Sequence, residues 1–189
     1  GLTFGAGDGT ADNTMTFSGT IANINTAIAT LTWTSATDED TDAVLTILSN
    51  DGDDTDSDTV AITVNSVNDV PVNTVSGAVS GNEDVAISIA TNSIADADHT
   101  SLTAVTISST QSGTFSLVGV SGLTFAAGDG TADNTMTFSG TVANINTAIA
   151  TITWTSATDD DTDAVLTILS NDGDDTDSDT VAITVNAVN

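Results

Sequence analysis

One internal repeat covers most of the chain and limits what it can fold into. Residues 1–68 match residues 122–189 at all but five positions. The five differences are conservative: Gly5/Ala126, Ile21/Val142, Leu31/Ile152, Glu39/Asp160 and Ser66/Ala187. The two segments start 121 residues apart, which exceeds the roughly 20–50-residue periods of solenoid arrays and is typical of a whole domain. The sequence therefore predicts copies of one domain in tandem.

A short polar stretch at 65–71 sets the boundary between these copies. It follows an alternating segment and ends in Val70-Pro71, the only proline of the chain. We expect this stretch to be a hinge between domains. One complete domain is then predicted for residues 69–189, and residues 1–68 form the C-terminal part of another copy. The strands equivalent to 69–121 are missing from that copy, or a neighbouring chain supplies them.

Most segments of the complete domain alternate apolar and polar residues with a period of two, which indicates half-buried strands. The alternating segments include 85–90, 104–107, 135–139, 151–155 and 180–185, and 164–169 is more evenly apolar, as a central strand would be. About seven short strands of this kind, rich in Val and Thr, predict an all-β sandwich. One segment differs: Thr141 can cap a short helix at about 142–150, and the same helix is expected at about 21–29.

The charge of the chain excludes several classes of function. It has 27 Asp and Glu, no Lys or Arg, and one His, for a formal charge of −27. Such repulsion opposes folding, so counter-ions must come from solution, as bound divalent cations or as high salt. Nucleic acids and anionic membranes are excluded as partners. Without Cys, Lys, Arg or Tyr, few routes exist to an activated nucleophile, so we expect no enzyme. No apolar run approaches the ~20 residues of a membrane span, and no disulfide can form.

The repeated phrases resemble a known family. GLTFAAGDGTADNTMTFSGTVANINTAIATITWT, SDTVAITVNAVN and VNDVPVN are similar to the cadherin-like tandem repeats of giant bacterial surface adhesins. This resemblance implies tandem Ig/cadherin-like β-sandwich repeats with one short helix each, located outside the cell, secreted or on the bacterial surface. It also implies calcium binding, identical neighbouring repeats or chains as partners, and a structural or adhesive role in a calcium-stiffened fibre or spacer. Surface glycans are a further expected partner.

Clustered carboxylates are the expected calcium ligands, because calcium takes 6–8 oxygen ligands. Of the 27 acidic residues, 18 lie in 38–58 and 159–179. The first predicted centre is the joint between copies, as in calcium-dependent cadherins, with ligands from both copies and the hinge. Its residues are Asp38, Glu39, Asp40, Asp42, Asn68, Asp69, Glu83, Asp172, Asp174 and Asp175. The second is predicted at the C-terminal end of the complete domain, from Asp96, Asp98, Asp159, Asp161 and Asp163. A third candidate is Asp129, with its equivalent Asp8.

Other interpretations of these residues stay open. Asp-Gly and Asn-Asp-Gly are ordinary turn formers, so some of these acids are expected to be solvated turns only. His99 is expected to be a solvent-facing loop residue, and Trp33 and Trp154 to be core residues. An alternative function is a ligand-binding module that recognises glycan or ice through a Thr-rich sheet face.

Overall fold

The computed structural model describes residues 1–189, and the chain is all-β with two short helices. It divides into two units, Gly1–Asn65 and Ser66–Asn189, three residues before the boundary expected from the sequence. No helix of the structure is both long and apolar enough to cross a membrane. We describe the two units separately, and call them unit 1 and unit 2.

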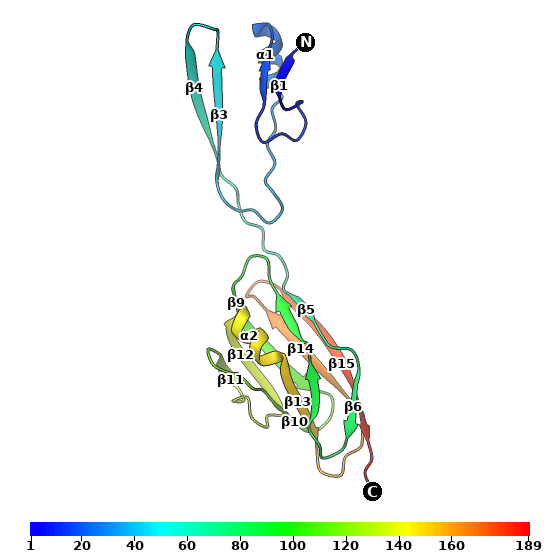
Figure 1. The fold of residues 1–189 in the computed structure, drawn as a ribbon. Helices are drawn as coiled ribbons and strands as arrows, with labels where there is room; N and C mark the ends of the chain where they lie inside the picture. The colour runs from blue at the N-terminus through cyan, green and yellow to red at the C-terminus, as the bar shows by residue number, and fades with distance from the viewer. The chain divides into compact units, whose positions relative to one another are not determined.

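The larger sheet of unit 2 has six strands in the order β11-β12-β9-β14-β15-β6 (Figure 1). Their bounds are β6 Val79–Asn82, β9 Ser101–Ser109, β11 Thr124–Ala127, β12 Thr135–Thr141, β14 Ala164–Asn171 and β15 Thr176–Asn186. All neighbours are antiparallel except β15 and β6, which run parallel. The evenly apolar segment 164–169 lies in β14, between β9 and β15, and is therefore an interior strand as expected.

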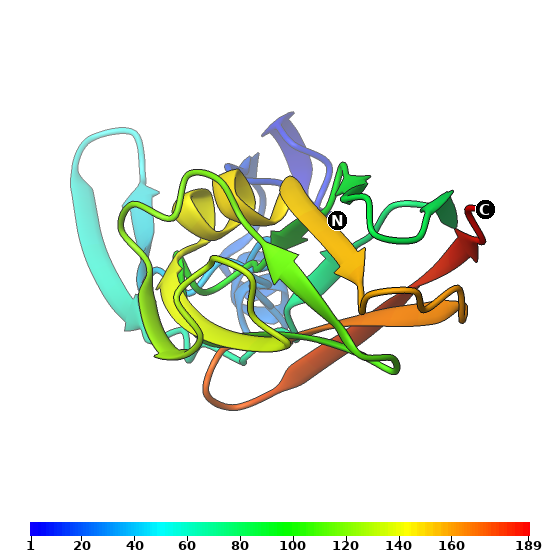
Figure 2. The ribbon, with the colours of Figure 1, turned by 90° about the horizontal axis from the view of Figure 1, so that it is seen from below.

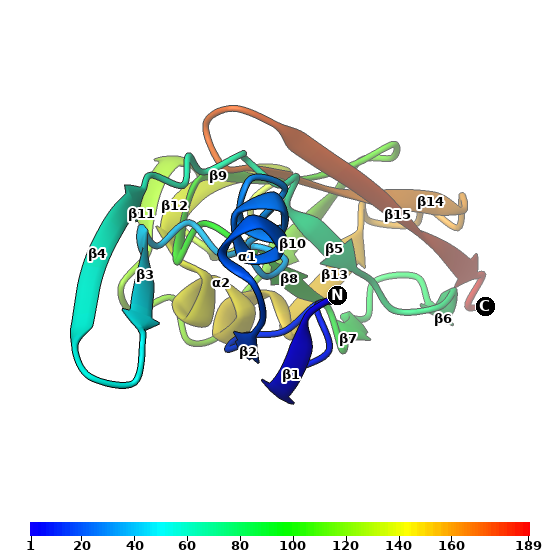
Figure 3. The same ribbon diagram turned by 90° about the horizontal axis from the view of Figure 1, so that it is seen from above.

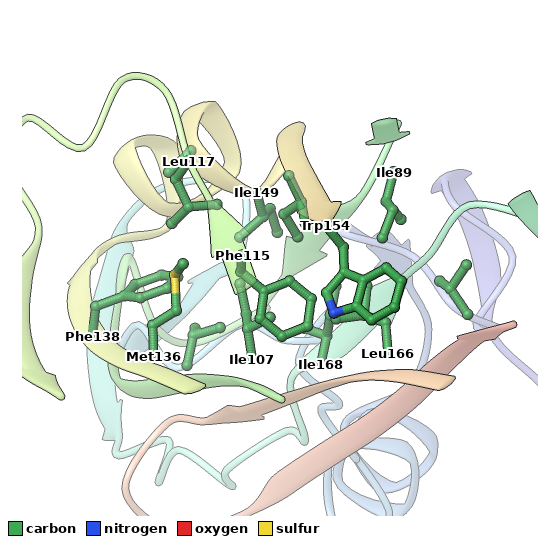
Figure 4. Close-up of a cluster of buried hydrophobic side chains, with 14 of the residues drawn as sticks. Ile89, Ile107, Phe115, Leu117, Met136, Phe138, Ile149, Trp154, Leu166 and Ile168 are labelled. Atoms are coloured by element: carbon green, nitrogen blue, oxygen red, sulfur yellow. The ribbon is translucent and has the colours of Figure 1, made fainter. Parts of the chain in front are cut away.

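A second sheet of three strands lies across the first (Figure 2). Its order is β10-β13-β7, with β7 Ile87–Ala90, β10 Gly113–Ser116 and β13 Thr151–Ser156. A small pair, β5 Val72–Thr74 and β8 Ser93–Ala95, completes the unit. The core fills the space between the sheets, and Trp154, Phe115, Phe138, Met136 and Leu166 are among its largest fully buried members (Figure 4). Each is at most 1% exposed.

The short helix α2, Val142–Ile149, begins where the sequence predicts. The Thr141 hydroxyl caps it by accepting a hydrogen bond from the Asn144 N–H at 3.2 Å. Ile145 and Ile149 of this helix are fully buried. The expected strands also form, but unit 2 has additional short strands that the alternation did not indicate, namely β5, β6, β8 and β11. Each has only three or four residues, too few to show a period of two.

Unit 1 forms most of the same local elements, but without a core and without a counterpart of β13. Its elements are β1 Thr3–Ala6, β2 Thr16–Ser18, α1 Ile21–Ile28, β3 Ala43–Asn50 and β4 Thr55–Ile62. They make two separate hairpin sheets, β1-β2 and β3-β4 (Figure 3). No residue of unit 1 is buried. Trp33 is 46% exposed, whereas its equivalent Trp154 is 1% exposed, so the expectation that both tryptophans are core residues holds only for Trp154.

Candidate metal centre

The acidic hairpin between β14 and β15 folds around Asp172. Its carboxylate Oδ1 accepts hydrogen bonds from the N–H groups of Asp174 at 2.8 Å and Asp175 at 2.7 Å. Gly173 occupies the turn with a φ of 123°, which favours glycine. The backbone N–H of Asp175 is the main cause that lowers the pKa of Asp172 from 3.8 to about 2, against the effect of burial. The Asn68 amide, the Asp174 N–H and His99 lower this pKa further. Asp172 is therefore a carboxylate at neutral pH.

The hinge is fastened to this hairpin by its own polar residues. The side-chain amide of Asn68 donates to Asp172 Oδ2 and to Asp175 Oδ2, each at 3.1 Å. The backbone N–H of Asp69 donates to Asp98 Oδ2 at 2.6 Å. Hydrogen bonds to charged acceptors are stronger than neutral ones. The chain therefore enters unit 2 through a contact with three carboxylates.

Asp96 is the unusual member of this group. Its Oδ1 accepts the N–H groups of Asp98 at 3.0 Å and His99 at 2.7 Å. Its side chain is fully buried, and Oδ2 has no hydrogen-bond partner. Ligand atoms of Asp96, His99 and Asp172 all lie within 4.8 Å of one another. A buried carboxylate oxygen without a partner is costly, and a bound cation would offset that cost.

We call Asn68, Asp69, Asp96, Asp98, Asp172 and Asp175 the hinge pole. Its carboxylate oxygens are hard ligands that suit calcium. The nearby His99 offers nitrogen, which is not a calcium ligand, and its Nδ1 lies 3.4 Å from Asp96 Oδ1. The orphan Asp96 Oδ2 and the neighbouring Asp172 thus fit a divalent cation on chemical grounds. Asp174 belongs to the same turn and is exposed.

The predicted grouping of Asp96 and Asp98 with Asp159, Asp161 and Asp163 is wrong. Strand β8 pairs antiparallel with β5, and Ala95 lies opposite Val72. Asp96 comes directly after Ala95 in the chain, and it therefore lies beside the start of β5, next to the hinge. The alternation of apolar residues does not reveal this short pairing, so the sequence left the direction of β8 undetermined.

The predicted approach of Glu83 to the hinge is also wrong. Strand β6 runs parallel to β15, with Asn82 opposite Asn186, so Glu83 lies at the C-terminal end of unit 2. There its Oε1 accepts the N–H of Val188 at 2.7 Å.

The acids of the 159–163 loop lie at the same C-terminal end of unit 2 and make hydrogen bonds there. Asp163 Oδ1 accepts the N–H of Val185 at 2.9 Å, and the Asp159 N–H donates to Asp84 Oδ1 at 3.3 Å. Asp161 is exposed in this loop. The bonds of Glu83 and Asp163 hold the last residues of the chain beside the sheet.

The acids of unit 1 form local contacts of the same kind. Asp42 Oδ1 accepts the N–H of Val64 at 3.0 Å, which repeats the bond of Asp163. Glu39 accepts the N–H of Thr41 at 3.0 Å, Asp38 adopts a φ of 56°, and Asp40 is exposed. The expectation that these four acids complete a site with the hinge concerns the relation between the two units and stays a prediction.

Two residues outside the predicted sites, Asn73 and Ser170, fix the hinge end of unit 2. The Asn73 N–H donates to Asp177 Oδ2 at 2.6 Å, and its buried amide donates to the carbonyls of Ile168 and Asp177. The Ser170 hydroxyl donates to Asn73 Oδ1 at 2.8 Å. These bonds join β5 to β14 and β15. The available signal was only a lone Asn two residues after Pro71.

The third candidate loop is organised by a different acid. Asp133 Oδ2 accepts the N–H groups of Asp129 at 2.8 Å and Gly130 at 2.9 Å. Asp12 makes the equivalent bonds to Asp8 and Gly9 in unit 1, and these N–H groups lower its pKa. Asp8 and Asp129 are exposed turn residues, and each accepts one backbone N–H two positions later.

Comparison with protein families and with characterised proteins finds no match to this chain. Among solved structures, an endo-fucoidan hydrolase from glycoside hydrolase family 107 aligns over 100% of the chain. The sequence identity is 17% and the TM-score is 0.27. The chain spans 24% of that enzyme's length. A likeness this low carries no argument about function.

Proposed function

We propose that this chain is part of a structural or adhesive repeat protein, secreted by or displayed on a bacterium, in which calcium at the hinge pole stiffens the entry to each domain. The cadherin-like resemblance of the repeated phrases motivates the family and the extracellular location. The main observation in support of a bound metal is the Oδ2 atom of Asp96, which is buried and has no hydrogen-bond partner. Neighbouring repeats, calcium and surface glycans are the proposed partners.

The charge of the chain supports a cation as the missing partner. The chain has no Lys or Arg, so no side chain other than His99 can neutralise Asp96. The amide of Asn68 donates to Asp172 Oδ2 and to Asp175 Oδ2, and each of these oxygens keeps a second lone pair that a cation could use. A cation held there would link the hinge to the hairpin and to the loop after β8. The free energy of unfolding of unit 2 would then depend on calcium.

A melting experiment tests this proposal directly. We expect 10 mM calcium to raise the Tm relative to EDTA at matched ionic strength. Calcium at 100 times its Kd would stabilise the folded state by about 2.7 kcal/mol, or about 10 °C for a unit of this size. Asp96→Asn keeps the shape of the side chain and removes the charge, and it should abolish most of the shift.

The matched control is Asp179→Asn, which removes one acid of β15 outside the hinge pole. It should leave the calcium-dependent shift intact, because Asp179 is not among the proposed ligands. Equal Tm values in calcium and EDTA for the wild-type chain would reject the metal. An equal loss of the shift in both variants would mean that calcium acts only by screening charge.

A second candidate function rests on a row of hydroxyl groups. Thr135, Ser108, Thr167 and Thr180 lie opposite one another across β12, β9, β14 and β15. They occupy the face of the sheet that points away from the core, with a spacing of about 4.8 Å between strands. Such a row suits an ordered hydroxyl-rich ligand, such as glycan or ice. Glycan-array binding or inhibition of ice recrystallisation that is lost in Thr167→Val would support this function, and silence in both assays would reject it.

A further inference from the structure

His99 is the only histidine of the chain, and one of its nitrogens has no partner. The sequence predicts a solvent-facing loop residue, and the side chain is 35% exposed. Its Nδ1 atom, however, is buried and makes no hydrogen bond. In a neutral imidazole that carries its proton on Nε2, Nδ1 offers a lone pair to a proton donor or to a metal ion. The buried edge of this ring therefore holds a ligand atom that the protein itself does not use.

Two carboxylates lie close to this nitrogen. Ligand atoms of Asp96, His99 and Asp172 lie within 4.8 Å of one another, and Nδ1 is 3.4 Å from Asp96 Oδ1. A hydrogen bond from a charged nitrogen to a carboxylate is about 2.7–2.9 Å long, so a proton on Nδ1 would be poorly placed for Asp96. Two ligands of one tetrahedral zinc ion lie about 3.3 Å apart, given bonds of about 2.0–2.1 Å. The spacing fits an ion between the side chains better than a shared proton.

Both carboxylates are held in position without an ion. Oδ1 of Asp96 accepts the N–H groups of Asp98 and His99, and Oδ1 of Asp172 accepts two N–H groups of its own turn. The other oxygen of Asp96 has no partner, although the side chain is fully buried. Groups that are already oriented lose little freedom on binding a ligand. The free atoms of this group are thus prepared to bind an ion.

The mixture of donor atoms determines which class of ion suits these three residues. Calcium and magnesium take oxygen ligands. Imidazole nitrogen suits zinc, copper and nickel, and zinc is bound by combinations of histidine nitrogen and carboxylate oxygen. One nitrogen beside two carboxylates therefore favours a transition-metal ion over calcium.

We propose that Asp96, His99 and Asp172 form a binding site for a divalent transition-metal ion of the zinc class, and that His99 Nδ1 is the ligand that selects this ion over calcium. The inference deepens the proposed function, because it rests on the hinge pole as a cation site and adds the class of ion. The bound ion would join the turn 96–99 to the hairpin 171–175. Three protein ligands leave the fourth tetrahedral position to water.

Titration of the full chain with zinc chloride, in a buffer that contains about 10 mM calcium, tests the proposal. The calcium occupies sites made of oxygen alone, so zinc held by scattered carboxylates contributes little. Isothermal titration calorimetry should give one zinc ion per chain. His99→Gln should weaken this binding by more than roughly 100-fold, which is the upper range for the loss of a group that only supports a ligand.

The single histidine also gives a readout that needs no variant. In the chain labelled with ¹⁵N, the imidazole nitrogens of His99 give one pair of NMR signals. We expect zinc to shift the Nδ1 signal, with saturation at one equivalent, while Nε2 keeps its proton. An Nδ1 signal that zinc leaves in place would overturn the proposal.

The variants separate this site from the calcium of the proposed function. His99→Gln should keep the rise in Tm with calcium, Asp96→Asn should lose the response to both ions, and the control Asp179→Asn should keep both. Zinc that binds wild type and His99→Gln equally, with the calcium shift intact, would overturn the zinc site alone. Zinc binding through His99 without any calcium shift would support the zinc site and reject calcium.

Discussion

The repeat allows the same substitution to be tested at two equivalent positions, in two separate variants. One position is packed in a core and the other is not. Leu166 is fully buried in β14, close to Trp154 in the core (Figure 4). Leu166→Ala removes buried carbon atoms and leaves a cavity, which costs about 3 kcal/mol. For a unit of this size that corresponds to a Tm lower by about 10 °C. Leu45→Ala makes the same change where no core exists, and it should cost less than about 0.5 kcal/mol.

Differential scanning calorimetry of the two variants and the wild type measures this difference. The main transition reports unit 2, because unit 1 has no buried residue and should add little cooperative heat. Chemical denaturation should agree, with a urea midpoint lower by about 2 M for Leu166→Ala at a slope of about 1.5 kcal/mol/M. Equal losses in Leu45→Ala and Leu166→Ala would refute the description of unit 1 as an open half. An additional cooperative transition assigned to unit 1 would refute it as well.

Three further predictions follow from single contacts. Asn73→Ala should cost about 2–3 kcal/mol in urea unfolding, because it removes the buried hydrogen bonds of this side chain to the Ile168 and Asp177 carbonyls and to the Ser170 hydroxyl; a loss under 0.5 kcal/mol would contradict this. Thr141→Ala should cost about 1 kcal/mol through loss of the helix cap, whereas Thr20→Ala in unit 1 should not change the main transition. The lowered pKa of Asp172 means that its charged form stabilises the folded state above pH ~3.8, and that this contribution is lost as the pH falls toward 2. In EDTA, the Tm difference between wild type and Asp172→Asn should therefore narrow from pH 4 to pH 2, and a constant difference would contradict the assignment.

The sequence predicted the elements better than the sites. Period-two alternation indicated the longer strands, and Thr141 indicated the start of α2, because both signals are local. The grouping of acids failed where it depended on the direction of a short strand. Asp96 reaches the hinge because of the pairing of β8 with β5, and Glu83 leaves it because β6 runs parallel to β15. Strands of three or four residues carry too little pattern to indicate either pairing.

The acids also differ in how much of their role a sequence can indicate. Asp42 and Asp163 each accept the N–H of a residue 22 positions later, and Asp172 accepts two N–H groups within its own turn. These carboxylates stabilise the backbone through hydrogen bonds even without a bound ion. Asp96 alone combines a fully buried side chain with an oxygen that nothing satisfies. Composition predicts external cations without naming a ligand, and only burial separates Asp96 from its solvated neighbours.

The two copies show which parts of the domain are locally determined. The hairpin β3-β4 has the register of β14-β15: Ala43 lies opposite Ile62 as Ala164 lies opposite Ile183, and the Asn50–Thr55 pair matches Asn171–Thr176. Both helices form under the same threonine cap, at 3.3 and 3.2 Å. Strand β13 forms only in unit 2, although its sequence differs from 30–35 by a single Ile-for-Leu change. Hairpins and capped helices therefore follow from adjacent residues, whereas the strand that carries Trp154 depends on partners between Ile87 and Ser116.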